Sequence, residues 1–135
     1  MALSKYLANE LNDMVLRNAA WTPPSSVFVA LFTGSGGLDD NAPVAEIVGG
    51  SYTRLEVGGA TGRSFSISSG KRSDNDEIWV MPTATANWGT ITHVAVMSAV
   101  SSGNVFYYGA LTTAKIVNSG ATMRFLAGEL DALFT

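Results

Sequence analysis

The sequence predicts an all-β fold, an antiparallel β-sandwich of immunoglobulin-like or jelly-roll type with one N-terminal α-helix. A helical pattern of apolar residues is confined to the start of the chain, before Pro23 and Pro24. After Pro24, short runs of β-branched and aromatic residues alternate with turn signals about every 8 to 12 residues, which is typical of sandwiches and barrels. The 135 residues suffice for one core. We therefore expect a single domain over 1–135, with a helix in 1–20 and the sandwich in 24–135.

The N-terminal helix is predicted from apolar side chains that share one face. The stripe comprises Leu3, Leu7, Leu11, Met14 and Val15. Ser4 can cap the first turn, and Asp13 can pair with Arg17 one turn later. The run Thr22-Pro23-Pro24 is expected to stop the helix. The stripe must cover an apolar surface, either the chain's own sheet, which is the usual arrangement, or a neighbouring subunit.

The rest of the chain is predicted to form short strands. Val27 to Phe32 is almost continuously apolar, so we expect a central strand buried on both faces. The other predicted strands are Tyr52–Val57, Phe65–Ile67, Ile78–Met81, Thr90–Met97, Val105–Ala110, Lys115–Val117, Thr122–Leu126 and Leu130–Phe134. The turn Ser101-Ser102-Gly103-Asn104 should join Thr90–Met97 to Val105–Ala110 as an antiparallel hairpin.

Two segments are predicted as loops. Gly34 to Gly50 contains clustered glycines and the acidic pair Asp39-Asp40, and loops of this length are usually functional or mobile. Lys71 to Glu77 is expected to be a charge-balanced turn. Its run Asp74-Asn75-Asp76-Glu77 offers oxygen ligands that calcium prefers, but an EF-hand would need a further ligand where the chain has Ile78. No metal site is predicted.

Composition narrows the classes of partner. The formal net charge is -3, with 14% charged and 47% hydrophobic residues. The chain lacks the basic surface expected of a nucleic-acid binder, and Lys71-Arg72 is its one basic pair. We expect no signal peptide, because the start Met-Ala-Leu-Ser-Lys-Tyr lacks a charged n-region and a long apolar run, and no apolar run approaches the roughly 20 residues of a membrane span. The absence of cysteine fits synthesis in a reducing cytosol. An apolar, weakly charged chain is typical of an oligomer, although an ordinary β-domain with a bland surface could have the same composition.

No catalytic constellation or cofactor site is predicted. The single histidine, His93, lies in a strand, where alternation places it on one face with Ile91, Ala95 and Met97. A serine hydrolase would need His93 as its base, but the chain has no Gly-x-Ser-x-Gly elbow, and no P-loop or Gly-x-Gly-x-x-Gly run is present either. We expect His93 to have a structural role or to lie at a subunit interface, and the protein not to be an enzyme.

Aromatic residues have two possible roles. They could stack on sugar rings or bases, but more often they belong to the core or cover a sheet edge. The residues concerned are Trp21, Tyr52, Trp79, Trp88, Tyr107 and Tyr108. Trp88, beside Gly89 at a strand entrance, is the best candidate for a fixed architectural contact. Tyr107 and Tyr108 should point to opposite faces of their strand.

Three ordered blocks carry a family resemblance. They include Tyr6-Leu7-Ala8-Asn9-Glu10-Leu11 followed by Trp21-Thr22-Pro23-Pro24, then Asn87-Trp88-Gly89-Thr90-Ile91, and finally Asn104-Val105-Phe106-Tyr107-Tyr108-Gly109 followed by Phe125-Leu126-Ala127-Gly128. The chain resembles small virion structural proteins of tailed bacteriophages, described as tail-fibre, head-decoration or collar proteins. The resemblance implies a non-enzymatic component of the virion that is made in the host cytoplasm.

The expected function is assembly as a homo-oligomer on the particle, as a head decoration, a neck or collar subunit, or a tail attachment. The expected partners are further copies of the chain and the major capsid, neck or tail proteins, without direct contact with nucleic acid or membrane. The alternative is a receptor- or carbohydrate-binding module of a tail fibre. The candidate interface residues are Leu3, Leu7, Leu11, Met14, Trp21, Trp88, His93 and Tyr108.

Overall fold

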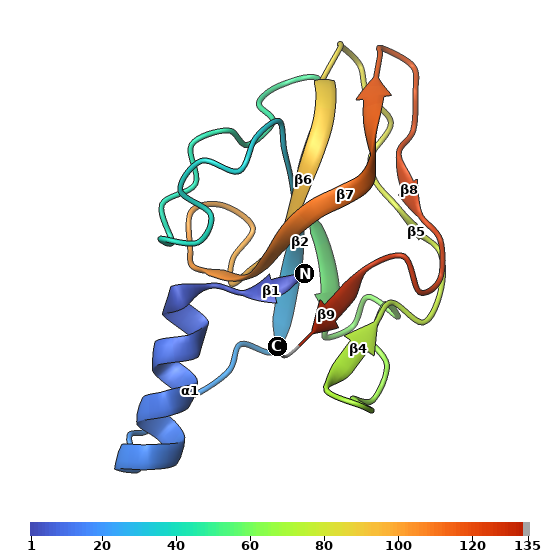
Figure 1. The fold of residues 1–135 in the computed structure, drawn as a ribbon. Helices are drawn as coiled ribbons and strands as arrows, with labels where there is room; N and C mark the ends of the chain where they lie inside the picture. Colours follow the sequence, from blue (N-terminus) through green and yellow to red (C-terminus); the bar gives the residue numbers. More distant parts are fainter. Residues whose placement is uncertain (134–135) are drawn as a thin grey trace.

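The computed structural model describes residues 1–133, which form one helix and nine strands (Figure 1). The helix α1 spans Lys5–Arg17. The strands are β1 (Ala2–Leu3), β2 (Ser26–Phe32), β3 (Leu55–Gly58), β4 (Arg72–Asp74), β5 (Trp79–Val80), β6 (Gly89–Met97), β7 (Val105–Val117), β8 (Arg124–Phe125) and β9 (Asp131–Leu133).

Three antiparallel sheets build the domain. The largest has five strands in the order β1-β7-β6-β2-β3, and the pairs β4-β9 and β5-β8 form two-stranded ladders. Side chains from the large sheet and from the β5-β8 ladder share one core, which includes Val29, Trp79 and Phe125. The predicted all-β sandwich with an N-terminal helix is confirmed.

Strand β2 is buried on both faces, as its sequence predicts. The residues from Val29 to Phe32 have no exposed surface. Val29 and Leu31 belong to the core shared with the small ladders, whereas Ala30 and Phe32 pack on the other face with Leu38. Leu38 lies in the predicted loop Gly34 to Gly50, so this loop covers the second face of the sheet.

The ladder of β6 and β7 has two register shifts, one between Ile91 and His93 and one between Val96 and Met97. The turn uses positive φ angles at Ser102 and Gly103. The two predicted strands Val105–Ala110 and Lys115–Val117 are one strand, β7, with extra residues between its pairs with Ile91 and His93. This irregularity breaks the alternation, so the predicted shared face of Ile91 and His93 is wrong. Ile91 lies in the core with Val94, whereas His93 pairs with Phe32 on the opposite face.

Several strand boundaries differ from the prediction. Phe65 forms only an isolated bridge to Asn75, and the predicted charged turn contains β4 instead, because that segment pairs with β9. Strand β3 begins at Leu55, three residues later than predicted. The last residue of the predicted strand Leu130–Phe134 lies outside the described residues.

Helix α1 begins at Lys5, after the first residue of the predicted apolar stripe. Ser4 caps it as predicted, and therefore Leu3 lies outside the helix, where it pairs with Tyr107 in the edge strand β1. The helix ends at Arg17 because Asn18 adopts a left-handed conformation with φ 54. The prolines at 23 and 24 follow several residues later and do not end it.

Candidate interaction surfaces

The first turn of α1 is fixed to the sheet by Ser4. The backbone N–H of Ser4 donates to the Phe106 carbonyl at 2.9 Å, its hydroxyl donates to the Val105 carbonyl, and the same hydroxyl accepts from the Leu7 N–H at 3.2 Å. Tyr6 stacks on Phe106 with ring centroids 6.2 Å apart, and Trp21 meets the same ring edge-on at 6.0 Å. These contacts set the direction in which α1 leaves the sheet.

The distal half of α1 extends away from the sandwich (Figure 1). Leu7 is the one buried residue of the helix, and Leu11 is half-buried. Met14, Val15 and Leu16 are 37%, 73% and 77% exposed. The N-terminal part of the predicted apolar stripe therefore covers the chain's own sheet, and its C-terminal part does not. We call Met14, Val15 and Leu16 the helix tip.

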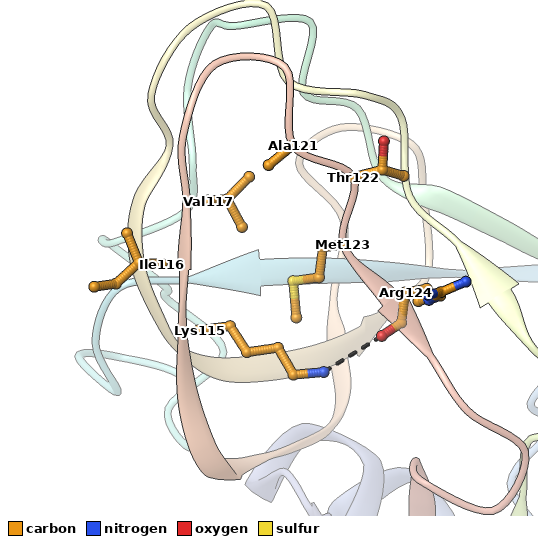
Figure 2. Close-up of a pocket in the computed structure, with 7 residues that line it drawn as sticks. All are labelled: Lys115, Ile116, Val117, Ala121, Thr122, Met123 and Arg124. Atoms are coloured by element: carbon orange, nitrogen blue, oxygen red, sulfur yellow. Dashed lines mark hydrogen bonds between the residues drawn. The ribbon is translucent and has the colours of Figure 1, made fainter.

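A second surface lies between β7 and the segment that leads into β8. This opening, which we call the seam, has a volume of about 370 Å³ and is lined by Lys115, Ile116, Val117, Ala121, Thr122, Met123 and Arg124. Figure 2 shows Val117, Ala121 and Met123 directed into the space between the two segments, and Ile116 directed away from it. The Lys115 ammonium crosses the seam and donates to the Arg124 carbonyl at 3.3 Å.

A buried ion pair joins the loop Gly34 to Gly50 to the hairpin turn. Arg54 binds both carboxylate oxygens of Glu46 at 2.7 Å and donates to the carbonyls of Ala99 and Ser102. Hydrogen bonds to Glu46 raise the pKa of Arg54. Tyr52 donates to Glu46 at 2.9 Å, and burial raises the pKa of the Tyr52 hydroxyl. Each polar group has a partner, so this network fixes the architecture.

The other candidate interface residues occupy different places. Trp88 is 5% exposed and its indole N–H donates to the Gly50 carbonyl at 2.9 Å. This bond fixes the end of the predicted loop Gly34 to Gly50. Tyr108 is half-buried against the cluster that contains Leu38. The Nδ1 atom of His93 lies 2.8 Å from Oγ1 of Thr92. In residues 1–133, His93 forms no hydrogen bond or ion pair with a carboxylate that could orient it as a base.

Side chains of the acidic run Asp74 to Glu77 form hydrogen bonds and an ion pair within the fold. Asn75 is 1% exposed, accepts from the Leu130 N–H, and donates to the carbonyls of Glu77 and Leu126. Asp74 binds Arg72 at 2.9 Å. Among residues 1–133, no group of three or more His, Cys, Asp or Glu side chains could hold a metal ion. No helix in this range is long and apolar enough to cross a membrane.

Sequence reasoning missed Asn75, the Arg54–Glu46 pair and the seam. The arginine beside Leu55 in the predicted strand Tyr52–Val57 was a signal for a buried ion pair, because charged residues are seldom buried without a partner. Nothing local marks Asn75, whose partners Leu126 and Leu130 are about fifty residues away. The seam depends on how side chains of β7 meet those of the segment that leads into β8, and no local sequence pattern reports that.

The sandwich, the projecting helix and the hydrogen-bonded polar clusters define a small structural module. The family described as podophage GP4 fiber I protein gp80 matches residues 2–132. The chain belongs to this family, and it is accordingly a structural component of a bacteriophage virion. None of the curated proteins that were compared matches it.

Proposed function

We propose that the chain is a structural subunit that self-associates through the helix tip when it assembles on the virion. The observation that carries this proposal is the exposure of Val15 and Leu16, at 73% and 77%, on a helix that leaves the body of the protein. The neck or collar, the head surface and the tail are all sites at which such a subunit could attach to capsid, neck or tail proteins.

The physical reason is that α1 is poorly supported in a single chain. A helix of 13 residues is marginal without tertiary packing, and only its first turns contact the sheet. Packing the tips of two or more helices against one another would bury Met14, Val15 and Leu16, and apolar burial contributes about 25 cal/mol per Å². Association would therefore order the distal half of α1 as well as join the subunits.

Sedimentation equilibrium of the purified chain tests the proposal. We expect a mass that is a multiple of the 14.1 kDa monomer. Leu16→Glu should shift the equilibrium to monomers, whereas Ile67→Glu, at a position that is 95% exposed and outside the helix tip, should not. A monomer at all concentrations, or equal behaviour of the two variants, would contradict self-association through α1.

Substitution is a cleaner test than removal of residues 1–20. That truncation would also delete β1, which pairs with β7, and Ser4, which binds the carbonyl of Val105. A change in assembly would then reflect damage to the sheet. The single substitution at Leu16 leaves these contacts in place.

The alternative of a carbohydrate-binding module has less support. Stacking on sugar rings needs exposed aromatic faces. In the described part of the chain, Trp79 and Trp88 are buried and Trp21 packs against Phe106. A glycan array separates the two functions, because specific glycan binding by the monomeric Leu16→Glu variant would favour the alternative.

A further inference from the structure

Leu16 points away from the side of α1 that faces the sheet. It follows the buried Leu7 by nine residues, which at 3.6 residues per turn is about two and a half turns. Met14 follows Leu7 by about two full turns and therefore lies on the same side as Leu7. Helices pack against each other through one apolar stripe. A single contact between two helix tips through Met14 and Val15 thus leaves Leu16 exposed, and covering it requires a further surface.

Asp13 lies beside Leu16 on this side of the helix. The two residues are three positions apart, so their side chains are neighbours on the helix surface. The Asp13 carboxylate lies 3.9 Å from the Arg17 guanidinium, and both side chains are exposed, so this ion pair contributes little. The Leu16 side of α1 therefore presents an apolar side chain next to a weakly paired carboxylate.

The outer face of the β5–β8 ladder is apolar around one arginine. Trp79 and Phe125 lie opposite each other in the ladder and are fully buried, so alternation turns their neighbours outward. These neighbours are Ile78, Val80, Arg124 and Leu126. The three apolar ones are 51% to 55% exposed, and we call the four residues the ladder patch.

Arg124 is the charged group of the ladder patch. Figure 2 shows its side chain directed away from Lys115 and from the seam. Within residues 1–133 Arg124 forms no ion pair, whereas Lys115 binds Glu129 at 3.1 Å. An apolar surface with an unpaired arginine is complementary to an apolar surface with a carboxylate, because opposite charges across a contact steer association and fix its register.

The Leu16 side of α1 and the ladder patch cannot meet within one chain. The helix projects at the lower left of Figure 1, and β5 and β8 lie at the right, on the other side of the sandwich. The base of the helix is fixed to β7 by Ser4, which binds the carbonyls of Val105 and Phe106. Contact between these two surfaces therefore requires two copies of the chain.

We propose that the Leu16 side of α1 docks on the ladder patch of a second copy. Leu16 covers Val80 and its apolar neighbours, and the Asp13 carboxylate of one copy binds the Arg124 guanidinium of the other. This inference rests on the proposed self-association through the helix tip and adds the surface that receives it. Because each copy carries both surfaces on opposite sides, the same contact repeated from copy to copy builds a ring or an open chain.

Sedimentation equilibrium of the purified chain tests the role of the ladder patch. Val80→Glu places a carboxylate where Leu16 and Asp13 dock, and it should raise the dissociation constant at least about tenfold. Ile116→Glu is the matched control, because Ile116 is an exposed apolar residue outside the ladder patch, and it should associate like the unchanged chain. Thermal unfolding shows whether each variant is folded. Equal association of the two variants would overturn docking on the ladder patch.

The behaviour of Leu16→Glu separates this inference from the proposed function. If Leu16→Glu is monomeric while Val80→Glu associates like the unchanged chain, the helix tip joins subunits through another surface and the ladder patch is excluded. If Leu16→Glu also associates like the unchanged chain, the proposed function itself is contradicted.

Exchange of the two charges gives a second measurement, which replaces the first if Val80→Glu does not fold. Asp13→Arg and Arg124→Asp should each weaken association by about fivefold, because like charges then face each other. The double variant should recover most of this loss, since the ion pair forms again with its charges reversed. Recovery would come from contact between copies, because the two residues lie on opposite sides of one chain. A double variant as weak as the single variants would overturn the proposal.

Discussion

The end of strand β2 and the end of helix α1 have similar apolar sequences and opposite environments. Leu31 and Phe32 have no exposed surface, whereas Val15 and Leu16 are 73% and 77% exposed. Strand β2 is covered by other parts of the same chain, through the small ladders on one face and the loop around Leu38 on the other. The comparison separates apolar residues that stabilise the subunit from exposed ones, for which we propose a second purpose, contact between subunits.

The largest expected effect distinguishes these two purposes directly. Phe32→Ala should lower the free energy of unfolding by about 3 to 5 kcal/mol, because it leaves a cavity in a fully buried site. Leu16→Ala, measured under conditions in which the chain is monomeric, should change it by less than about 0.5 kcal/mol. Urea unfolding measures both. A cost for Leu16→Ala close to that of Phe32→Ala would mean that the helix tip is covered within the monomer.

The next effect concerns the loop that covers one face of β2. Arg54→Met should cost about 3 kcal/mol, because it leaves the Glu46 carboxylate unpaired and removes the donor to the Ala99 and Ser102 carbonyls. The double variant Glu46→Gln/Arg54→Met should recover part of this loss in the same unfolding measurement. No recovery would show that the bonds to the hairpin turn, and not the ion pair, carry the effect.

A smaller loss is expected where a side chain binds only backbone. Asn75→Ala should destabilise the fold by about 2 kcal/mol, because the buried N–H of Leu130 and the partly buried carbonyls of Glu77 and Leu126 lose their partner. The control is Asn87→Ala, since Asn87 is exposed and accepts one bond from the Ser119 N–H. Equal thermal stability of the two variants would contradict a structural role for Asn75.

The smallest effect is electrostatic and lies at the surface. A hydrogen bond from the Arg72 guanidinium holds the pKa of Asp74 below its usual range. Because the pKa is lower in the folded protein, the ionised carboxylate stabilises the fold above about pH 3.9, and this contribution is lost as the pH falls through the folded value. An NMR titration should show the Asp74 pKa rising towards its usual value in Arg72→Gln. An unchanged pKa would assign the shift to Ser66, which also binds Asp74.

Local patterns predicted the elements whose structure depends on neighbouring residues. The apolar run of β2, the Ser4 cap and the turn between β6 and β7 are all found where the sequence places them. Even the end of α1 has a local signal, because asparagine tolerates the left-handed conformation seen at Asn18. Leu3 was misassigned because its spacing matched the helical stripe, although it lies before the cap.

Pairing between residues distant in the chain determined the elements that local patterns did not predict. The irregularity in the β6–β7 ladder places Ile91 in the core, away from His93, and periodicity alone cannot detect such a change of register. Strand β4 exists because β9 pairs with it, and Phe65–Ile67 is not a strand because it forms only one bridge. In each case the energy comes from residues distant in the chain.

The sequence by itself determined an all-β chain with one N-terminal helix, a doubly buried strand and few charges, because these follow from periodicity and composition. Only the tertiary structure decided which apolar residues remain exposed, because exposure depends on which surfaces the packing of the chain leaves uncovered. The stripe from Leu7 to Val15 is continuous in sequence, yet the sheet reaches only its first turns. Within residues 1–133, the edge of β7 beyond Tyr108 lacks a strand partner in the same way, since β1 is too short to cover it.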